Sequence, residues 1–135
     1  MSRAAALLVV LMAACAKEPT TAGTSGPENR ASRPAASELV MRGERLLVSG
    51  QLEEAHRAFE AAIDEDPEDP RAWLDLGLTL EAQDKPTAAM KAYLKATELD
   101  PAFAEAFNNL GVLQRESGDL PAAIESLERA AKLDP

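Results

Sequence analysis

The chain has 135 residues, which is enough for one domain. Its formal net charge of −9 argues against nucleic-acid binding, because phosphates require a basic surface, and against broad adhesion to anionic lipid. A basic or apolar partner suits this charge better. The single cysteine, Cys15, excludes an internal disulfide framework.

The N-terminal segment has the pattern of a secretion signal. Arg3 is followed by an uncharged run from Ala4 to Ala14, which corresponds to a basic n-region and a short apolar h-region. A helix that spans a bilayer needs about 20 apolar residues, so this run is too short to cross a membrane comfortably. Residues 1–14 are therefore predicted to be a signal peptide.

The end of this run resembles a bacterial lipobox. The residues Leu11-Met12-Ala13-Ala14 stand directly before Cys15, with Met12 where leucine is usual. The resemblance implies that Cys15 receives a diacylglyceryl group and becomes the first residue of a lipid-anchored chain. Ala16 stands where an aspartate would signal inner-membrane retention in enteric bacteria. This favours the outer membrane of a bacterial cell envelope, facing the periplasm.

Ordinary cleavage is the alternative. Ala14-Cys15-Ala16 is also an Ala-x-Ala site, which would leave a soluble periplasmic protein that begins at Lys17. Residues 15–35 are predicted to comprise the lipidated cysteine and a flexible tether. Threonine, glycine, serine and proline dominate this segment, so it cannot bury enough apolar surface to offset the entropy lost on ordering.

The rest of the chain is built from an internal repeat. Asp-Pro recurs at a step of 34 residues, and several other residue types keep the same step. The columns in register are Asp66, Asp100 and Asp134; Gly43, Gly77 and Gly111; Ala55, Ala89 and Ala123; Phe59, Tyr93 and Leu127; and Ala62, Ala96 and Ala130. We therefore divide residues 36–135 into copies 36–69, 70–103 and 104–135.

Each copy is predicted to form two helices, A and B, joined by a turn. In the second copy Asp69-Pro70 opens helix A, because proline is tolerated in a first helical turn. Asp100-Pro101 ends helix B, because a residue before proline avoids the helical region. Gly50 and Gly118 suit a left-handed residue in the A–B turn, where the second copy has Asp84.

The recurring glycines of helix A predict a close crossing of helices A and B. A glycine inside a helix costs about 1 kcal/mol relative to alanine, so its recurrence indicates a steric need. We expect the glycines to face the helix B alanines Ala55, Ala89 and Ala123. One hairpin cannot bury its apolar stripe alone, whereas three stacked hairpins can.

The second copy has the pattern of a known helical repeat. The pattern is Trp73-x-x-Leu76-Gly77-x-x-Leu80, followed by Ala89, Tyr93, Ala96 and Pro101. It resembles the tetratricopeptide repeat. The resemblance covers residues 36–135 and implies an all-α fold, a right-handed superhelix (α-solenoid) of three helical hairpins.

The other two copies match this pattern with a few departures. The first copy has Leu39 in place of tryptophan and Arg42 in place of leucine. The third has Phe107 in place of tryptophan and Gln114 where the other copies have Leu46 and Leu80.

The resemblance also implies a protein-binding surface. In tetratricopeptide arrays the A helices line a concave groove that binds peptides or helices. Carried over by repeat position, the groove residues are Met41, Glu44 and Val48, then Leu74, Asp75, Leu78 and Glu81, then Asn108, Asn109, Val112 and Arg115.

The chemistry of these positions predicts the kind of partner. The chaperone-binding subclass of the repeat clamps a terminal carboxylate with lysine, arginine and asparagine, but here Glu44 and Asp75 hold two of those places. Leu74 and Leu78 with acidic neighbours favour an apolar segment with basic flanks. The alternative is that Leu74 and Leu78 pack partly against neighbouring A helices.

The sequence offers no catalytic set, and we predict no enzyme activity, no cofactor and no metal site. His56, the only histidine, has no histidine or cysteine companion and is expected on a solvated face. The acidic run from Asp64 to Asp69 lacks the glycine-centred spacing of a calcium loop.

The last helix B carries an apolar stripe formed by Leu120, Ile124, Leu127 and Ala131. No polar capping helix follows, so we expect this stripe to be partly exposed and available for self-association or a partner. The chain as a whole is predicted to be a membrane-anchored scaffold that helps an envelope complex to assemble. It is similar to the pilotin-like lipoproteins of type IV pilus and secretion systems. A self-associating structural lipoprotein is the alternative.

Overall fold

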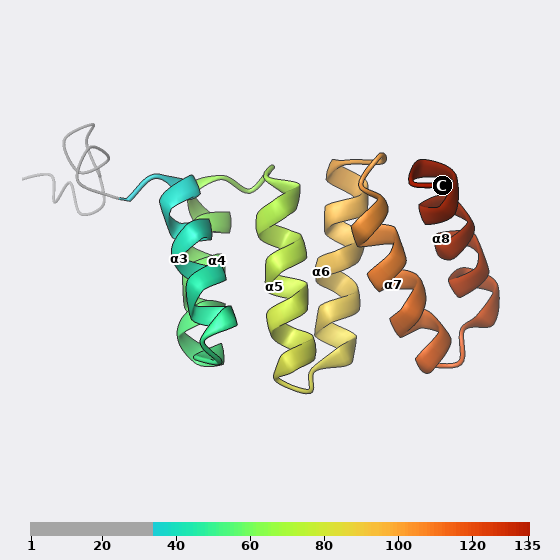
Figure 1. Ribbon diagram of the computed structural model, residues 1–135, viewed down its shortest axis with the longest axis horizontal. Helices are drawn as coiled ribbons and strands as arrows, with labels where there is room; N and C mark the ends of the chain where they lie inside the picture. The colour runs from blue at the N-terminus through green and yellow to red at the C-terminus, as the bar shows by residue number, and fades with distance from the viewer. Residues whose placement is uncertain (1–33) are drawn as a thin grey trace, which may run out of the picture. The chain divides into compact units, whose positions relative to one another are not determined.

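The computed structural model describes residues 34–135, which form helices and no strand (Figure 1). The helices are α3 (Ala36–Val48), α4 (Leu52–Glu65), α5 (Pro70–Ala82), α6 (Pro86–Leu99), α7 (Ala104–Glu116) and α8 (Leu120–Leu133). The predicted signal peptide and lipidation site, and nearly all of the predicted tether, lie outside the described residues. None of the helices in residues 34–135 has the length and hydrophobicity of a membrane-spanning segment.

The helices begin and end at the residues that the repeat predicts. Asp69 caps α5, because its Oδ1 accepts a hydrogen bond from the backbone N–H of Arg71 at 2.9 Å, and Pro70 occupies the first turn. The aspartates before proline end two of the B helices, since Asp66 and Asp100 have extended backbone conformations.

In every copy, one residue of the turn between helices A and B has a left-handed backbone conformation, and it stands at the same place in the repeat. Gly50 has a φ of 78°, Gly118 a φ of 88° and Asp84 a φ of 59°. The predicted glycine conformation is therefore confirmed. Aspartate is one of the few residues with a side chain that adopts this conformation with some frequency, so the second copy keeps the turn without glycine.

The hairpins α3–α4, α5–α6 and α7–α8 stack side by side, and each B helix packs against the A helix of the next hairpin (Figure 1). One continuous core runs from α3 to α7 and consists of small and aliphatic side chains around two buried rings, those of Phe59 and Tyr93. This is the α-solenoid that the repeat predicts, in which each hairpin buries the apolar face of its neighbour.

The close crossing predicted at the helix A glycines is confirmed, but its predicted partner is wrong. A Cβ atom on Gly43 would lie 2.5 Å from Cε1 of Phe59, and one on Gly111 would lie 2.7 Å from Cγ of Leu127. The nearest atoms at Gly77 belong to the Tyr93 ring. The glycines therefore make room for the large side chain of helix B, and not for the alanines Ala55, Ala89 and Ala123.

The departure of the first copy at Arg42 follows from its place in the array. The equivalent residues Leu76 and Leu110 are buried against the B helix of the preceding hairpin. No hairpin precedes α3 among the described residues, and Arg42 is exposed there. The charged side chain of Arg42 therefore stays hydrated on α3 and carries no cost of burial.

Candidate protein-binding face

The residues predicted to line a groove all lie on the first helix of a hairpin, α3, α5 or α7. Their exposure differs. Met41, Val48, Glu81, Asn108 and Arg115 are exposed, and Glu44, Leu78, Asn109 and Val112 are partly exposed. We call these nine residues the A face.

Two of the predicted groove residues are buried, and their assignment is corrected here. Leu74 has no exposed surface and belongs to the core, because α3 and α5 are in direct contact. The alternative interpretation, in which Leu74 packs against a neighbouring helix, is therefore the right one for this residue. Asp75 is 2 % exposed, so its carboxylate cannot act as a free surface charge.

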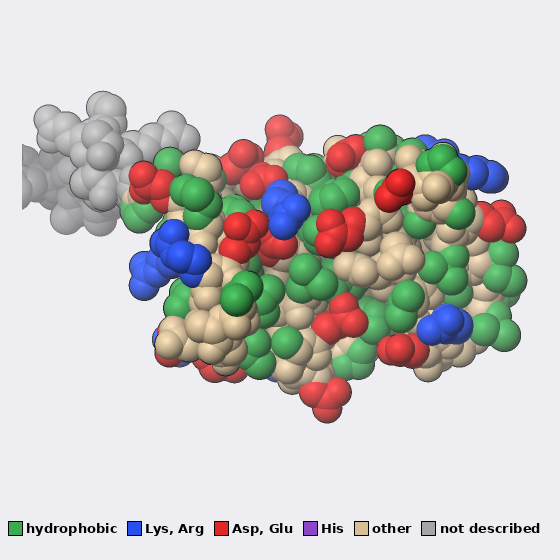
Figure 2. All heavy atoms as spheres, viewed as in Figure 1, with side chains coloured by type: hydrophobic (Ala, Val, Ile, Leu, Met, Phe, Trp, Pro, Cys, Tyr) green, Lys and Arg blue, Asp and Glu red, His purple; other side chains and the backbone are tan. Residues whose placement is uncertain are grey.

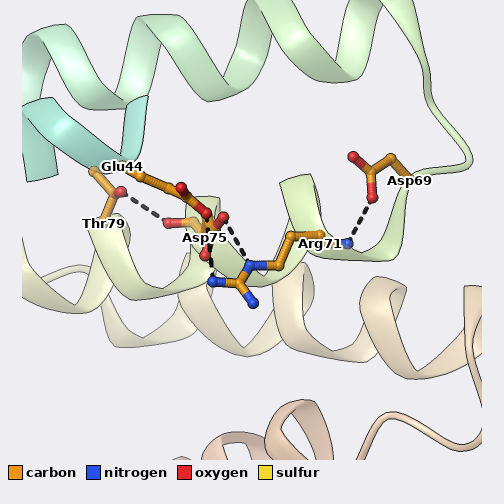
Figure 3. A network of polar contacts seen from close by, with 5 residues as sticks. All are labelled: Glu44, Asp69, Arg71, Asp75 and Thr79. Carbon is orange, nitrogen blue, oxygen red and sulfur yellow. Dashed lines mark hydrogen bonds and ion pairs between the residues drawn. The ribbon is translucent and has the colours of Figure 1, made fainter. Parts of the chain in front are cut away.

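Asp75 is held by a residue that the sequence analysis did not single out. Nε of Arg71 donates a hydrogen bond to Oδ2 of Asp75 at 3.2 Å, and Nη2 of Arg71 lies 3.4 Å from Oε1 of Glu44 on α3 (Figure 3). The hydroxyl of Thr79 donates to the backbone carbonyl of Asp75 at 2.8 Å. The spacing of Arg71 and Asp75, four residues apart on one helix, is the signal that could have predicted this pair.

The surroundings of Asp75 carry an excess of negative charge. Burial raises the pKa of Asp75 to about 6, the attraction of Arg71 opposes this rise, and the nearby charges of Glu44 and Glu105 add to it. These carboxylates come from α3, α5 and α7. Figure 2 shows acidic side chains gathered around a basic group over α5. This part of the molecule therefore presents a negative potential.

A second contact holds Glu81, which lies at the C-terminal end of α5. The phenol of Tyr93, on α6, donates a hydrogen bond to the carboxylate of Glu81. Burial and the neighbouring negative charge of Glu81 raise the pKa of Tyr93 far above its ordinary value, so the phenol remains a donor. Glu81 is exposed but held in place, which makes it a positioned charge on the A face.

The histidine is less solvated than predicted. Nδ1 of His56 lies 2.9 Å from Oε1 of Gln83, at the end of α5, and Nε2 lies 3.2 Å from Glu60. The prediction of a solvated face is wrong, because the neighbouring hairpin partly covers the ring. His56 has a structural role, since its ring joins α4 to the end of α5. No group of three or more metal-ligating side chains is present in residues 34–135.

The comparisons with known proteins agree with this geometry. Residues 40–102 match one family model described as "Tetratricopeptide repeat", and residues 92–125 match a second model of the same description. The chain therefore carries tetratricopeptide repeats. None of the curated proteins compared matches the chain.

Several solved structures share this fold at low sequence identity. The first tetratricopeptide repeat domain of Spaghetti (RPAP3) bound to the HSP90 peptide SRMEEVD is 22% identical, with a TM-score of 0.71 over 74% of this chain and 79% of that one. The second domain of Spaghetti, also bound to this peptide, is 21% identical, with a TM-score of 0.73 over 79% and 99%.

A third similar structure is that of MamA, which is 21% identical, with a TM-score of 0.71 over 74% of this chain and 58% of that one. At these identities the likeness establishes the fold of residues 34–135 and leaves the partner to be argued from this chain's own residues.

Proposed function

We propose that the protein is an adaptor that binds a segment of another protein on the A face, and that this segment is apolar with basic flanks. Met41, Leu78 and Val112 offer apolar surface on three successive A helices. Acidic residues lie beside them, and charge complementarity across an interface chiefly sets specificity and the rate of encounter. The observation that carries the proposal is the acid-rich surface around Arg71.

The same surface disfavours an acidic partner. The Spaghetti domains are similar in fold and bind the peptide SRMEEVD, which is rich in carboxylates. In this chain Arg71 is already engaged by Asp75 and Glu44, and Glu105 adds a further negative charge nearby. A carboxylate brought to this place would meet like charges, which costs free energy. We therefore propose a partner of opposite sign.

The setting that we propose is the bacterial cell envelope. Cys15 would carry the lipid that anchors the chain to the outer membrane, and residues 16–35 would hold the repeats in the periplasm. An adaptor in this position could help to assemble or place an envelope complex such as pilus or secretion machinery. A soluble periplasmic adaptor is the alternative if Cys15 is not acylated. The proposed role includes no catalysed reaction.

The adaptor role is tested by photo-cross-linking in intact cells. A photoreactive residue at Leu78 should capture a distinct protein, and the captured segment should contain apolar residues with lysine or arginine nearby. Replacing Glu44 and Glu81 together by glutamine should reduce the yield of this product several-fold and weaken its dependence on salt, because charge attraction is screened by ions.

A matched control uses acidic residues away from the A face. The change of Glu125 and Glu128 to glutamine removes the same charge from α8 and should leave the Leu78 product unchanged. An equal loss of the Leu78 product in both double variants would mean that binding depends on the net charge of the protein and not on the position of the acidic residues. No product from Leu78 would exclude the A face as the binding site. The mass of the mature N-terminus decides the anchor separately, since an unmodified Lys17 start contradicts lipidation.

A further inference from the structure

The last helix carries an apolar stripe that the other described residues cover only in part, since Leu127 packs on Gly111 of α7. Leu120 is 57 % exposed and Ile124 is 58 % exposed. Leu127 and Ala131 continue the stripe, and a hollow of about 480 Å³ lies beside it between α7 and α8, where Asn108, Leu127 and Ala131 are among the lining residues. We call Leu120, Ile124, Leu127 and Ala131 the α8 stripe.

The internal repeat shows what such a stripe does. The residues of α6 equivalent to Ile124, Leu127 and Ala131 are Met90, Tyr93 and Thr97, and none of them is exposed. They lie on the helix that packs against α7. Tyr93 and Leu127 pack on the glycine of their own hairpin, and the equivalent of Leu120 is the exposed Pro86. Ile124 and Ala131 therefore stand where a following helix would pack, and both are exposed, with Leu120, among residues 34–135.

A second copy cannot cover the stripe by continuing the array. The face of α3 that would meet the stripe carries Glu38, Arg42 and Arg45, which are all exposed. In α5 and α7 the places of Arg42 and Arg45 are taken by Leu76 and Thr79, and by Leu110 and Leu113, which are buried. Burying unpaired charges of α3 against Leu120 and Ile124 would cost more than the apolar contact contributes.

We propose that the α8 stripe pairs with the α8 stripe of a second copy, with the two helices antiparallel about a two-fold axis. The stripe has the spacing four, three, four, which is the spacing of a coiled-coil seam. In an antiparallel pair centred between residues 125 and 126, Leu120 lies opposite Ala131, and Ile124 lies opposite Leu127. The same register brings Lys132 opposite Asp119 at both ends of the pair.

This arrangement satisfies the requirement of a two-fold interface, in which one patch must be complementary to itself. The small Ala131 accommodates the larger Leu120, and the opposite charges of Lys132 and Asp119 favour the antiparallel direction. One helix pair buries less than the roughly 1,200–2,000 Å² of a stable complex, so the dimer is weak and depends on a high local concentration. The pairing leaves the A face free, since Met41 and Leu78 lie on other helices.

The pairing is tested in cells with the full chain and a photoreactive residue at Ile124. We expect a product of twice the chain's mass, in which the adduct maps to the region of Leu127 of the second copy. The same reagent at Met41, on exposed α3 surface, should give no such product. Absence of the doubled product from Ile124 would overturn the proposal, and so would an adduct that maps to α3.

A variant tests the contact itself. With the photoreactive residue at Ala131, the change Ile124→Glu should lower the yield of the doubled product at least about tenfold, because it places four carboxylates near one seam as the two glutamates meet Glu128 of each chain. Leu94→Glu is the matched control, because Leu94 is a similarly exposed leucine on α6. A doubled product that survives Ile124→Glu, or that Leu94→Glu removes equally, would contradict the pairing.

Discussion

The guanidinium of Arg71 and the carboxylate of Asp75 form an ion pair in which one partner is exposed and the other is buried. The side chain of Arg71 is 54% exposed and that of Asp75 is 3% exposed, with Nε and Oδ2 3.2 Å apart. A buried carboxylate depends on its partner for compensation of its lost hydration. Arg71 therefore supports the fold and occupies the acid-rich part of the A face at the same time.

Removal of Arg71 should destabilise the protein at neutral pH. Arg71→Ala leaves Asp75 buried without its counter-charge, and we expect a loss of roughly 1–3 kcal/mol in the free energy of unfolding, below the full value for a buried pair because Arg71 is half in solvent. Chemical denaturation at pH 7 measures it. The double change Arg71→Ala and Asp75→Asn should recover most of the loss, and a double variant as unstable as the single one would contradict this cause.

The pH dependence of stability should reveal Asp75. Its pKa is raised to about 6 in the folded protein, against roughly 4 in an unfolded chain. Between these values the folded state binds more protons. The free energy of unfolding should therefore fall as pH rises from about 4 to 6, by an amount on the order of 2 kcal/mol from this residue.

The variant Asp75→Asn isolates this contribution. It should remove the part of the slope that belongs to Asp75, so the difference in stability between the variant and the natural chain should change between pH 4 and 6 and be constant above pH 7. Denaturation curves at several pH values give this difference. A difference that does not vary with pH would show that Asp75 titrates at its ordinary value.

The helix A glycines should differ in how well they tolerate a methyl group. Gly43→Ala places a Cβ 2.5 Å from the buried ring of Phe59, and we expect overpacking of roughly 1–3 kcal/mol to outweigh the gain in helix propensity. Gly111→Ala meets the side chain of Leu127, which is partly exposed and can move, and the backbone N of Leu127 at 3.2 Å, which cannot, so its cost should be smaller but not zero. The melting temperature should fall more for Gly43→Ala, and equal falls would contradict the steric argument.

The third hairpin contains a polar pair that its neighbours lack. Oγ of Ser126 donates a hydrogen bond to Oε1 of Gln114 at 2.7 Å. The second copy has Leu80 and Ala92, both buried, at the same places. The change of both residues to leucine and alanine should raise the stability of the protein, because an apolar pair of fitting shape needs no compensating hydrogen bond.

The double change at this pair should leave the protein more stable than the sum of the two single changes suggests. Ser126→Ala removes the donor to Gln114 and should cost about 1 kcal/mol. A double-mutant cycle by thermal denaturation measures the coupling between the two side chains, which we expect to lie between about 0.5 and 1.5 kcal/mol. A coupling near zero would mean that the hydrogen bond does not contribute to stability.

The repeat period predicted the helices because it combined several independent local signals. The Asp-Pro pairs stop helix B through backbone sterics, and Asp69 caps helix A through its own carboxylate. Gly50 and Gly118 fit a turn that needs positive φ. All of these act within a few residues, so a sequence alone specifies them.

The candidate face was predicted less well. The register placed eleven residues on the A helices, but Leu74 and Asp75 are covered by contacts between helices of different hairpins. The bridge from Arg71 to Glu44 could not be predicted for the same reason, since it joins residues 27 positions apart. The pair of Arg71 and Asp75 could have been predicted from helical spacing. Helical spacing tells which side of a helix a residue occupies, and the distance to the next helix decides how much of that side stays in water.

The sequence by itself determined the number and limits of the helices, the order of the hairpins and the sign of the charge around the A helices, because these follow from local conformational preference and from a period of 34 residues. Only the tertiary structure decided which side chain each glycine accommodates, which acid is buried and which stripe of α8 stays exposed. These features depend on how closely helices approach each other, within one hairpin for the glycines and between hairpins for the buried acid, and those distances are set by the packing of the whole core.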